Sequence, residues 1–98
     1  MYEIDYTVRA KEELTWFKKH EQNEIIDEIE TQLRYEPTVE TRNRKRMRPN
    51  ATAEWELRIG NFRVLYDVDE QVRIVDIERV GLKRGNTFFF RGKEEEIG

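Results

Sequence analysis

Residues 54–69 read EWELRIGNFRVLYDVD, and the order of polar and apolar side chains in this stretch decides the fold. Apolar residues occupy alternate positions on both sides of Gly60-Asn61, which is the period of a half-buried strand. Gly60-Asn61 tolerates the positive φ that a tight turn requires. The stretch therefore predicts a β-hairpin with one face in a core. Arg58 and Arg63 lie on the opposite face, where a partly hydrated guanidinium offers five fixed donors to an anion such as a phosphate.

The remaining segments predict two helices and further strands around this hairpin. The expected elements are strands at residues 2–8, 54–60, 62–68 and 72–80, and helices at residues 9–20 and 21–35, with residues 87–90 as a candidate last short strand. Pro37 ends the second helix, because the residue before a proline resists the α conformation. Residues 38–53 show no sustained period and predict a long loop of the kind that usually has a function.

These elements predict one α+β domain over residues 1–98, in the order β-α-α-β-β-β, with a helical hairpin packed on one face of a twisted, mainly antiparallel sheet. The expected core side chains are Leu14, Phe17, Ile25, Ile29, Leu33, Trp55, Leu57, Phe62, Val64 and Tyr66. A slip of one residue in the hairpin would put Arg63 in the core and Phe62 outside, because side chains alternate between the two faces of a strand.

Composition excludes several classes of protein. The chain has no cysteine and one histidine, so neither a disulfide framework nor a metal site is expected, and no cofactor is indicated. With 40% charged residues and a mean hydropathy of -0.93, it has no apolar run near the roughly 18 residues of a membrane span. The polar N-terminus does not resemble a signal peptide, so the expected compartment is the cytoplasm.

Charge is distributed unevenly along the chain, although the net charge is only -3. Residues 1–41 contain five basic and eleven acidic side chains, whereas residues 42–98 contain thirteen basic and ten acidic side chains. A basic face matters more for polyanion binding than the net charge does. The second part of the chain therefore remains a candidate for binding nucleic acid.

Residues 42–48, RNRKRMR, contain five basic side chains in seven positions. A segment of this composition is either a solvated loop, an arm that binds an acidic partner, or a clamp on an RNA backbone, where neutralised phosphates release counterions. On the last interpretation, the candidate RNA-binding residues in this segment are Arg44, Lys45, Arg46 and Arg48.

Lys83 and Arg84 are expected near Arg63, because the strand that precedes them neighbours the Arg63 strand. Converging cations can stabilise the charge that develops on phosphorus during RNA cleavage, and this chemistry needs no metal. The alternative is an ordinary ion pair of Arg63 with Glu56 or Asp67. Residues 88–90, three consecutive phenylalanines, could stack on bases, use both faces of a strand, or line a groove for a protein partner.

The stretch WELRIGNFRVLYDVD followed by VGLKRGNTFFF resembles the second half of a RelE/ParE-family toxin of type II toxin–antitoxin systems, in its RelE-like branch. The first part of the chain also fits this family as a strand followed by two helices. The resemblance implies the RelE-like fold and an endoribonuclease (mRNA interferase) that acts on mRNA at the ribosome and inhibits translation. It also implies a cognate antitoxin as partner, with no membrane and no small-molecule cofactor.

The resemblance also assigns roles to individual residues. Arg63 falls on the arginine that binds the scissile phosphate, and Lys83 or Arg84 falls on a second basic catalytic position. Phe89 stands where the best-known branch has a catalytic tyrosine, so stacking on a base is retained and the hydroxyl is missing. Phe89 and Arg58, which shares the face of Arg63 in the hairpin, complete the set of expected RNA-binding residues.

Two glutamates depart from the family pattern. Glu54 and Glu56 stand where that branch has two lysines. Glu56 could act as a general base, or it could simply neutralise Arg63. The alternative function is therefore a binding module without nuclease activity on the same fold, either a ParE-like gyrase inhibitor or a protein that only binds its antitoxin.

Overall fold

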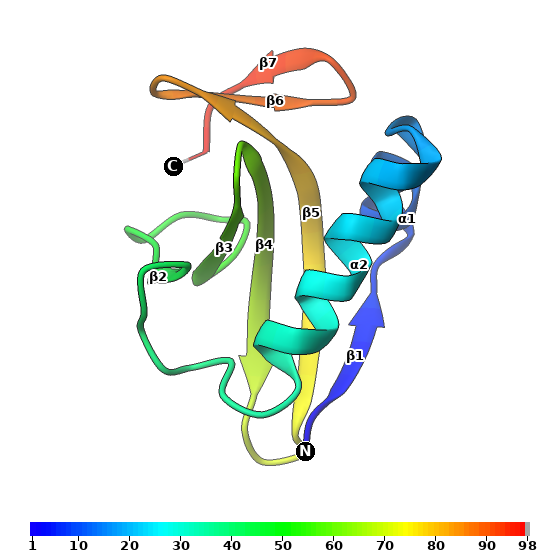
Figure 1. The fold of residues 1–98 in the computed structure, drawn as a ribbon. Coiled ribbons are helices and arrows are strands. Elements are labelled where there is room, and N and C mark those ends of the chain that lie inside the picture. The colour runs from blue at the N-terminus through cyan, green and yellow to red at the C-terminus, as the bar shows by residue number, and fades with distance from the viewer. Residues whose placement is uncertain (98) are drawn as a thin grey trace.

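The computed structural model describes residues 1–97 and has the expected α+β architecture (Figure 1). Its elements are β1 (Glu3–Tyr6), α1 (Val8–Trp16), α2 (Lys19–Leu33), β2 (Arg44–Arg46), β3 (Trp55–Ile59), β4 (Phe62–Asp69), β5 (Ile74–Arg84), β6 (Thr87–Phe90) and β7 (Lys93–Glu95). The predicted order of strands and helices is confirmed. Two short strands, β2 and β7, are additional to it.

One sheet contains all seven strands of the described residues. Six of them follow one another in the order β2-β3-β4-β5-β6-β7, and β1 pairs with β5 outside this order. Only β1 is parallel to its neighbour: it pairs with the first part of β5, while β6 pairs antiparallel with the last part of the same strand. The two helices cover one face of this sheet, and the β6–β7 hairpin lies across one end of it (Figure 1). The long strand β5 therefore runs from the helix-covered part of the sheet to the C-terminal hairpin.

The helix boundaries differ from the predicted ones by a few residues. Thr7 caps α1, because its hydroxyl accepts a hydrogen bond of 3.0 Å from the Ala10 amide. Phe17 and Lys18 both have extended backbones, so α1 ends before them and α2 begins at Lys19. The Glu21 carboxylate then accepts a hydrogen bond from the Lys18 amide, as in a capping box. Local capping thus places the break between the two helices earlier in the chain than the spacing of apolar residues predicted.

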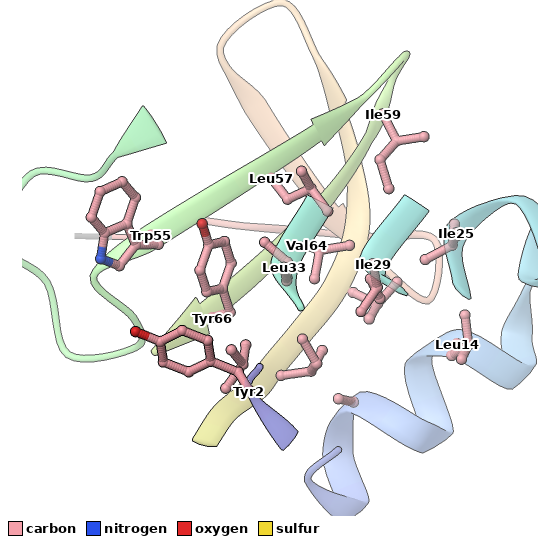
Figure 2. Packing of buried hydrophobic residues seen from close by; sticks show 14 of the residues in the cluster. Tyr2, Leu14, Ile25, Ile29, Leu33, Trp55, Leu57, Ile59, Val64 and Tyr66 are labelled. Carbon is pink, nitrogen blue, oxygen red and sulfur yellow. The ribbon is translucent and has the colours of Figure 1, made fainter. Parts of the chain in front are cut away.

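The predicted hairpin register is confirmed. Ile59 pairs with Phe62 and Arg58 with Arg63 across a two-residue turn, in which Gly60 has a φ of +57°. Phe62 packs edge-on against Phe17 at 5.3 Å on the helix-covered face. All of the expected core side chains lie in the main core between the helices and the sheet, with Phe62 partly buried at the margin of this core. Figure 2 shows helix residues such as Ile29 directed at strand residues such as Val64.

A second, smaller core lies on the opposite face of the sheet, which we call the outer face. It consists of Ala53, Leu65, Phe88 and Phe90, with Met47 and Ile97 packed against it. The rings of Phe88 and Phe90 stack at 5.9 Å. Leu65 alternates with Val64 and Tyr66 and shares the face of Arg63, yet it is fully buried in this second core. Of the three interpretations of residues 88–90, the structure favours a strand that uses both faces.

Gly81 allows the β6–β7 hairpin to fold closely onto β5. A Cβ atom at this position would lie 2.5 Å from the carbonyl oxygen of Phe89 and 2.6 Å from Cδ1 of Phe90. Since a backbone oxygen cannot move away without shifting β6, we expect Gly81→Ala to destabilise the fold by about 1–3 kcal/mol. Urea unfolding measures this change.

The matched control is Gly85→Asn. Gly85 has open space around it and a φ of +60°, which asparagine tolerates. We expect this substitution to be nearly neutral. Equal stabilities for Gly81→Ala and the wild type would contradict the close packing of the hairpin.

Candidate functional site

A groove on the outer face contains many of the basic residues singled out from the sequence. Its volume is about 710 Å³. We call it the basic groove; it is lined by Lys45, Arg46, Met47, Arg48, Pro49, Asn50, Glu56, Arg58, Lys83, Asn86, Phe88 and Ile97. The segment after β2 forms one wall, and the β5–β6 turn with the residues after β7 forms the other. Side chains of β3 lie between the two walls.

Glu56 and Arg58 lie on the charged floor of the basic groove, and Arg63 lies beside Glu56 without lining the groove itself. Glu56 is only 4% exposed, and its Oε1 accepts a hydrogen bond of 2.8 Å from Nε of Arg58. Its Oε2 lies 3.9 Å from Nε of Arg63. The Arg58 side chain is 42% exposed, so one face of its guanidinium remains open to the groove. A buried carboxylate thus holds two arginines side by side.

Arg63 is more deeply placed than the sequence indicated, with a side chain that is 15% exposed. Its Nη1 donates hydrogen bonds to the carbonyl oxygens of Gly60 and Phe62, at 2.7 and 2.9 Å. Its Nε is buried and has no hydrogen-bond partner. Burial lowers the pKa of Arg63, while Glu56 raises it and Arg58 lowers it further. The guanidinium remains charged, since arginine is not deprotonated in proteins, and its buried Nε–H is left without a partner.

Lys83 shares the outer face with Arg63, but Arg84 does not. Because β5 continues to Arg84 instead of ending near residue 80, these two neighbours point to opposite faces. Phe88, opposite Lys83 in the register, lies 5.0 Å from its Nζ. Arg84 pairs with Thr87 and Phe89 with Leu82, and the guanidinium carbon of Arg84 lies 6.0 Å from the centroid of the Phe89 ring. The structure therefore brings Lys83 to the groove and directs Arg84 and Phe89 away from it.

The side chains of the basic segment, residues 42–48, also differ in whether they face the groove. β2 pairs Lys45 with Glu56 on the outer face, so Lys45 faces the groove, and exposed Arg48 lies in its wall. Arg44 is only 8% exposed, and its guanidinium donates to the carbonyl oxygens of Val39 and Gln32 and to the Gln32 side chain. It ties the segment to the end of α2 and is not available to RNA, contrary to the sequence-based expectation.

Arg46 is committed to the edge of the sheet. Its guanidinium stacks over the Trp55 ring at 5.3 Å, and its Nη2 donates to Glu54 at 3.1 Å. Although Arg46 also lines the groove, these two contacts hold its charge on the far side of the strand. Four cations therefore face or border the groove floor with open access: Lys45, Arg48, Arg58 and Lys83.

An acidic row occupies the other half of the outer face. Asp5, Asp76 and Asp67 lie directly opposite one another on β1, β5 and β4. Glu78 lies beside them, where the register between β4 and β5 shifts, and it shares a hydrogen bond with Asp67. Burial, that hydrogen bond and the neighbouring charges raise the pKa of Glu78 to about 7. Like charges opposite one another destabilise a sheet, so this row costs stability near neutral pH.

We expect Glu78→Gln to remove much of this cost. A raised carboxyl pKa means that stability is fully present below the unfolded value of 4.5 and is lost as pH rises through about 7. The substitution should therefore change little at pH 4.5 and stabilise the protein by about 1 kcal/mol at pH 8, after allowance for solvent screening. Thermal unfolding at both pH values measures the difference. Glu24→Gln, on an exposed part of α2, is the control, and equal effects of the two substitutions would contradict this account.

Within residues 1–97, His, Asp and Glu side chains form no group of three or more that could hold a metal ion. Neither helix in this range has the length and apolar character needed to cross a bilayer.

The fold and the groove together define a class of protein: a small α+β domain with a helical hairpin on one face of its sheet and a basic groove on the other. Comparison with known proteins identifies this class. The family model described as ParE toxin of type II toxin–antitoxin system, parDE, matches residues 4–86. The chain therefore belongs to the ParE toxins of type II toxin–antitoxin systems, within the RelE/ParE family.

Solved structures share the fold. The chain is similar to a chain of the toxin–antitoxin complex RelBE2 from Mycobacterium tuberculosis, with 24% identity and a TM-score of 0.73 over 84% of this chain and 91% of that one. A chain of the archaeal RelE–RelB complex from Pyrococcus horikoshii OT3 is 19% identical, with a TM-score of 0.68 over 86% of this chain and 96% of that one.

The intact E. coli RelBE toxin–antitoxin complex also contains a similar chain. It is 20% identical, with a TM-score of 0.67, over 87% of this chain and 100% of that one. A comparison with curated protein sequences found no match.

Proposed function

We propose that this toxin is a metal-independent endoribonuclease that binds mRNA in the basic groove and cleaves it during translation at the ribosome. The observation that carries the proposal is the buried Glu56 carboxylate, 2.8 Å from Arg58 and 3.9 Å from Arg63. A carboxylate beside two guanidiniums combines a proton acceptor with cations that stabilise an anionic transition state.

The reaction would use the RNA's own 2′-hydroxyl as nucleophile. Glu56 accepts the proton of that hydroxyl as its oxygen attacks phosphorus, and the bond to the 5′ oxygen breaks. The 5′ oxygen takes a proton from water, leaving a 2′,3′-cyclic phosphate and a 5′-hydroxyl. Arg58, which is open to the groove, and Arg63, which lies beside Glu56, stabilise the charge on the phosphoryl oxygens. Lys83 and Lys45 contribute sequence-independent attraction for the backbone.

An antitoxin is the second proposed partner. The solved relatives described above are toxins in complex with antitoxins, and the family model describes a two-component system. A segment without a fixed fold of its own and with acidic side chains would complement the basic groove. Because Phe88 and Phe90 are already packed in the outer core, contacts with this segment would depend on the groove cations more than on these rings.

A second function is favoured by two observations. The family model is that of ParE toxins, and Phe89 points away from the groove instead of toward it. A ParE-like gyrase inhibitor, or a toxin that acts only by binding, needs no base at position 56. In that case Glu56 serves only to neutralise Arg58 and Arg63.

Mapping of RNA 5′ ends after induction of the toxin distinguishes these functions. We expect cleavage within translated mRNAs, and its loss when the start codon of a reporter mRNA is removed. Growth inhibition with intact mRNA and altered DNA supercoiling would instead identify the gyrase inhibitor.

Glu56→Gln separates the two roles of the carboxylate. If Glu56 is the general base, we expect cleavage to fall by about 10²–10⁴-fold, while RNA affinity stays level or rises because a negative charge is lost. If Glu56 only neutralises the arginines, RNA affinity should rise or stay level and cleavage should not fall. Glu54→Gln is the matched control, since this exposed neighbour pairs with Arg46 at the sheet edge. Single-turnover cleavage and fluorescence anisotropy measure the two quantities.

A further inference from the structure

Arg79 of β5 is a buried charge outside the basic groove, with a side chain that is only 4% exposed. Its guanidinium bonds to Glu13 of α1, with Nε and Nη2 at 2.8 and 2.7 Å from the same carboxylate oxygen. Nη1 and Nη2 also donate to the two oxygens of Glu95 in β7, at 2.8 and 3.0 Å. The guanidinium carbon lies 3.8 Å from the centroid of the Phe90 ring. One side chain thus joins α1, β5, β6 and β7.

The α1 side of this network is fixed. Glu13 is 3% exposed, and its second oxygen accepts a hydrogen bond of 3.0 Å from the Val80 amide. A carboxylate held by both a guanidinium and a backbone amide of β5 has little freedom to move. Arg79 is therefore anchored to the helical layer from one side.

The β7 side is more accessible. The Glu95 side chain is 40% exposed and also accepts a hydrogen bond of 3.3 Å from Arg9 of α1. The hydrogen bonds from Arg79 lower the pKa of Glu95. This pair ties the β6–β7 hairpin to the rest of the protein through a buried charge, whereas a further ion pair of the hairpin with α1, Arg91 with Glu12 at 3.8 Å, is exposed.

The same hairpin carries one wall of the basic groove. Phe88 of β6 and Ile97, which follows β7, both line the groove, whereas Arg79 and Glu95 do not. Phe88 also packs against Lys83. A shift of the hairpin would therefore move the wall and the ammonium group together.

We propose that the Arg79–Glu95 pair is a latch that positions the β6–β7 hairpin as a wall of the basic groove, so that both residues are positioning residues for RNA binding. The role in RNA binding rests on the function proposed above. The latch itself rests only on the contacts between Arg79, Glu13, Glu95 and Phe90.

Glu95→Gln tests the latch, because the amide keeps the size of the side chain and loses the charge-assisted pair. Glu94→Gln is the matched control: Glu94 is the exposed neighbour on the same strand, and within residues 1–97 it forms no ion pair. Both substitutions remove one negative charge near the groove. Charge alone would therefore strengthen RNA binding equally in the two variants.

We expect opposite effects instead. In Glu95→Gln, amide hydrogen exchange in residues 87–95 should become about tenfold faster, with no change in β3 and β4, because local opening no longer has to break charged hydrogen bonds. Affinity for a short, single-stranded 2′-O-methyl RNA, which cannot be cleaved, should weaken about threefold as the competent position of the wall becomes less populated. Glu94→Gln should leave exchange unchanged and bind this RNA slightly more tightly.

Exchange in Glu95→Gln that matches Glu94→Gln would overturn the latch. Faster exchange combined with tighter RNA binding would overturn its role in positioning the wall. If the wild-type protein does not bind the RNA at all, the proposed nuclease function fails, and the exchange measurement still decides whether the latch exists.

Discussion

Replacement of Arg63 by alanine is expected to abolish RNA cleavage and growth inhibition while leaving the protein folded. The guanidinium lies 3.9 Å from the Glu56 carboxylate of the groove floor, and its buried Nε–H has no hydrogen-bond partner. Loss of a charge-assisted contact with the scissile phosphate should reduce cleavage by at least about 10²-fold. The cost in stability should be near 1 kcal/mol, because the side chain also donates to two turn carbonyls.

Two further substitutions sharpen this experiment. Arg63→Lys should rescue only part of the activity, since an ammonium supplies the charge but not the planar arrangement of donors. Arg42→Ala removes the same charge from an exposed position that does not line the groove, and should leave cleavage unchanged. Cleavage rates and the thermal midpoint of each variant give the comparison. An Arg63→Ala variant as toxic as the wild type would remove the nuclease mechanism.

The hairpin that holds Arg63 could be predicted from sequence because one of its faces is buried. A slip of one residue would have exchanged Trp55 and Val64 with Glu56 and Arg63, and the cost of that exchange fixes the register. The same alternation placed Arg58 on the outer face, whereas Lys83 was expected only to lie near Arg63. What it could not give is the burial of Glu56, which is paired with Lys45 on β2.

Local sequence patterns did not predict the side-chain directions in the basic segment, residues 42–48. Arg44 and Lys45 are adjacent and equally charged in sequence, yet one is buried against α2 and the other faces the groove. The difference arises because β2, a strand of three residues, forms only by pairing with β3. Phe88 and Phe89 were separated in the same way, by the extension of β5 to Arg84. Sequence alone therefore predicted the kinds of residue in the site better than their orientation.

The Arg79 network had no signal in the sequence. Glu13 is separated from Arg79 by 66 positions and Glu95 by 16, so no helical or strand period connects them. In the sequence, nothing distinguishes any of these three residues from an ordinary surface charge. Only the packing of α1 and of the β6–β7 hairpin on β5 converts them into one buried group of charges.

Arg79→Leu is the substitution for which we expect the largest loss of stability. Leucine fills part of the space but leaves Glu13, which is 3% exposed, as a buried charge without its cation. Breaking a buried pair by removal of one partner typically costs about 3–5 kcal/mol, and in a domain of this size each kcal/mol lowers the unfolding midpoint by roughly 4–8 °C. The midpoint in a thermal unfolding experiment should therefore fall by more than about 12 °C.

The double variant Glu13→Gln/Arg79→Leu distinguishes charge from packing. Glutamine can still accept the hydrogen bond from the Val80 amide, while no uncompensated charge remains at position 13. We expect the double variant to recover more than half of the lost stability, so that the two substitutions are strongly non-additive. Recovery of less than a quarter would show that Arg79 acts through its contacts with Phe90 and Glu95 instead. Because Glu95 is retained in both variants, the comparison isolates the pair that anchors β5 to α1, while the Glu95→Gln experiment addresses the hairpin alone.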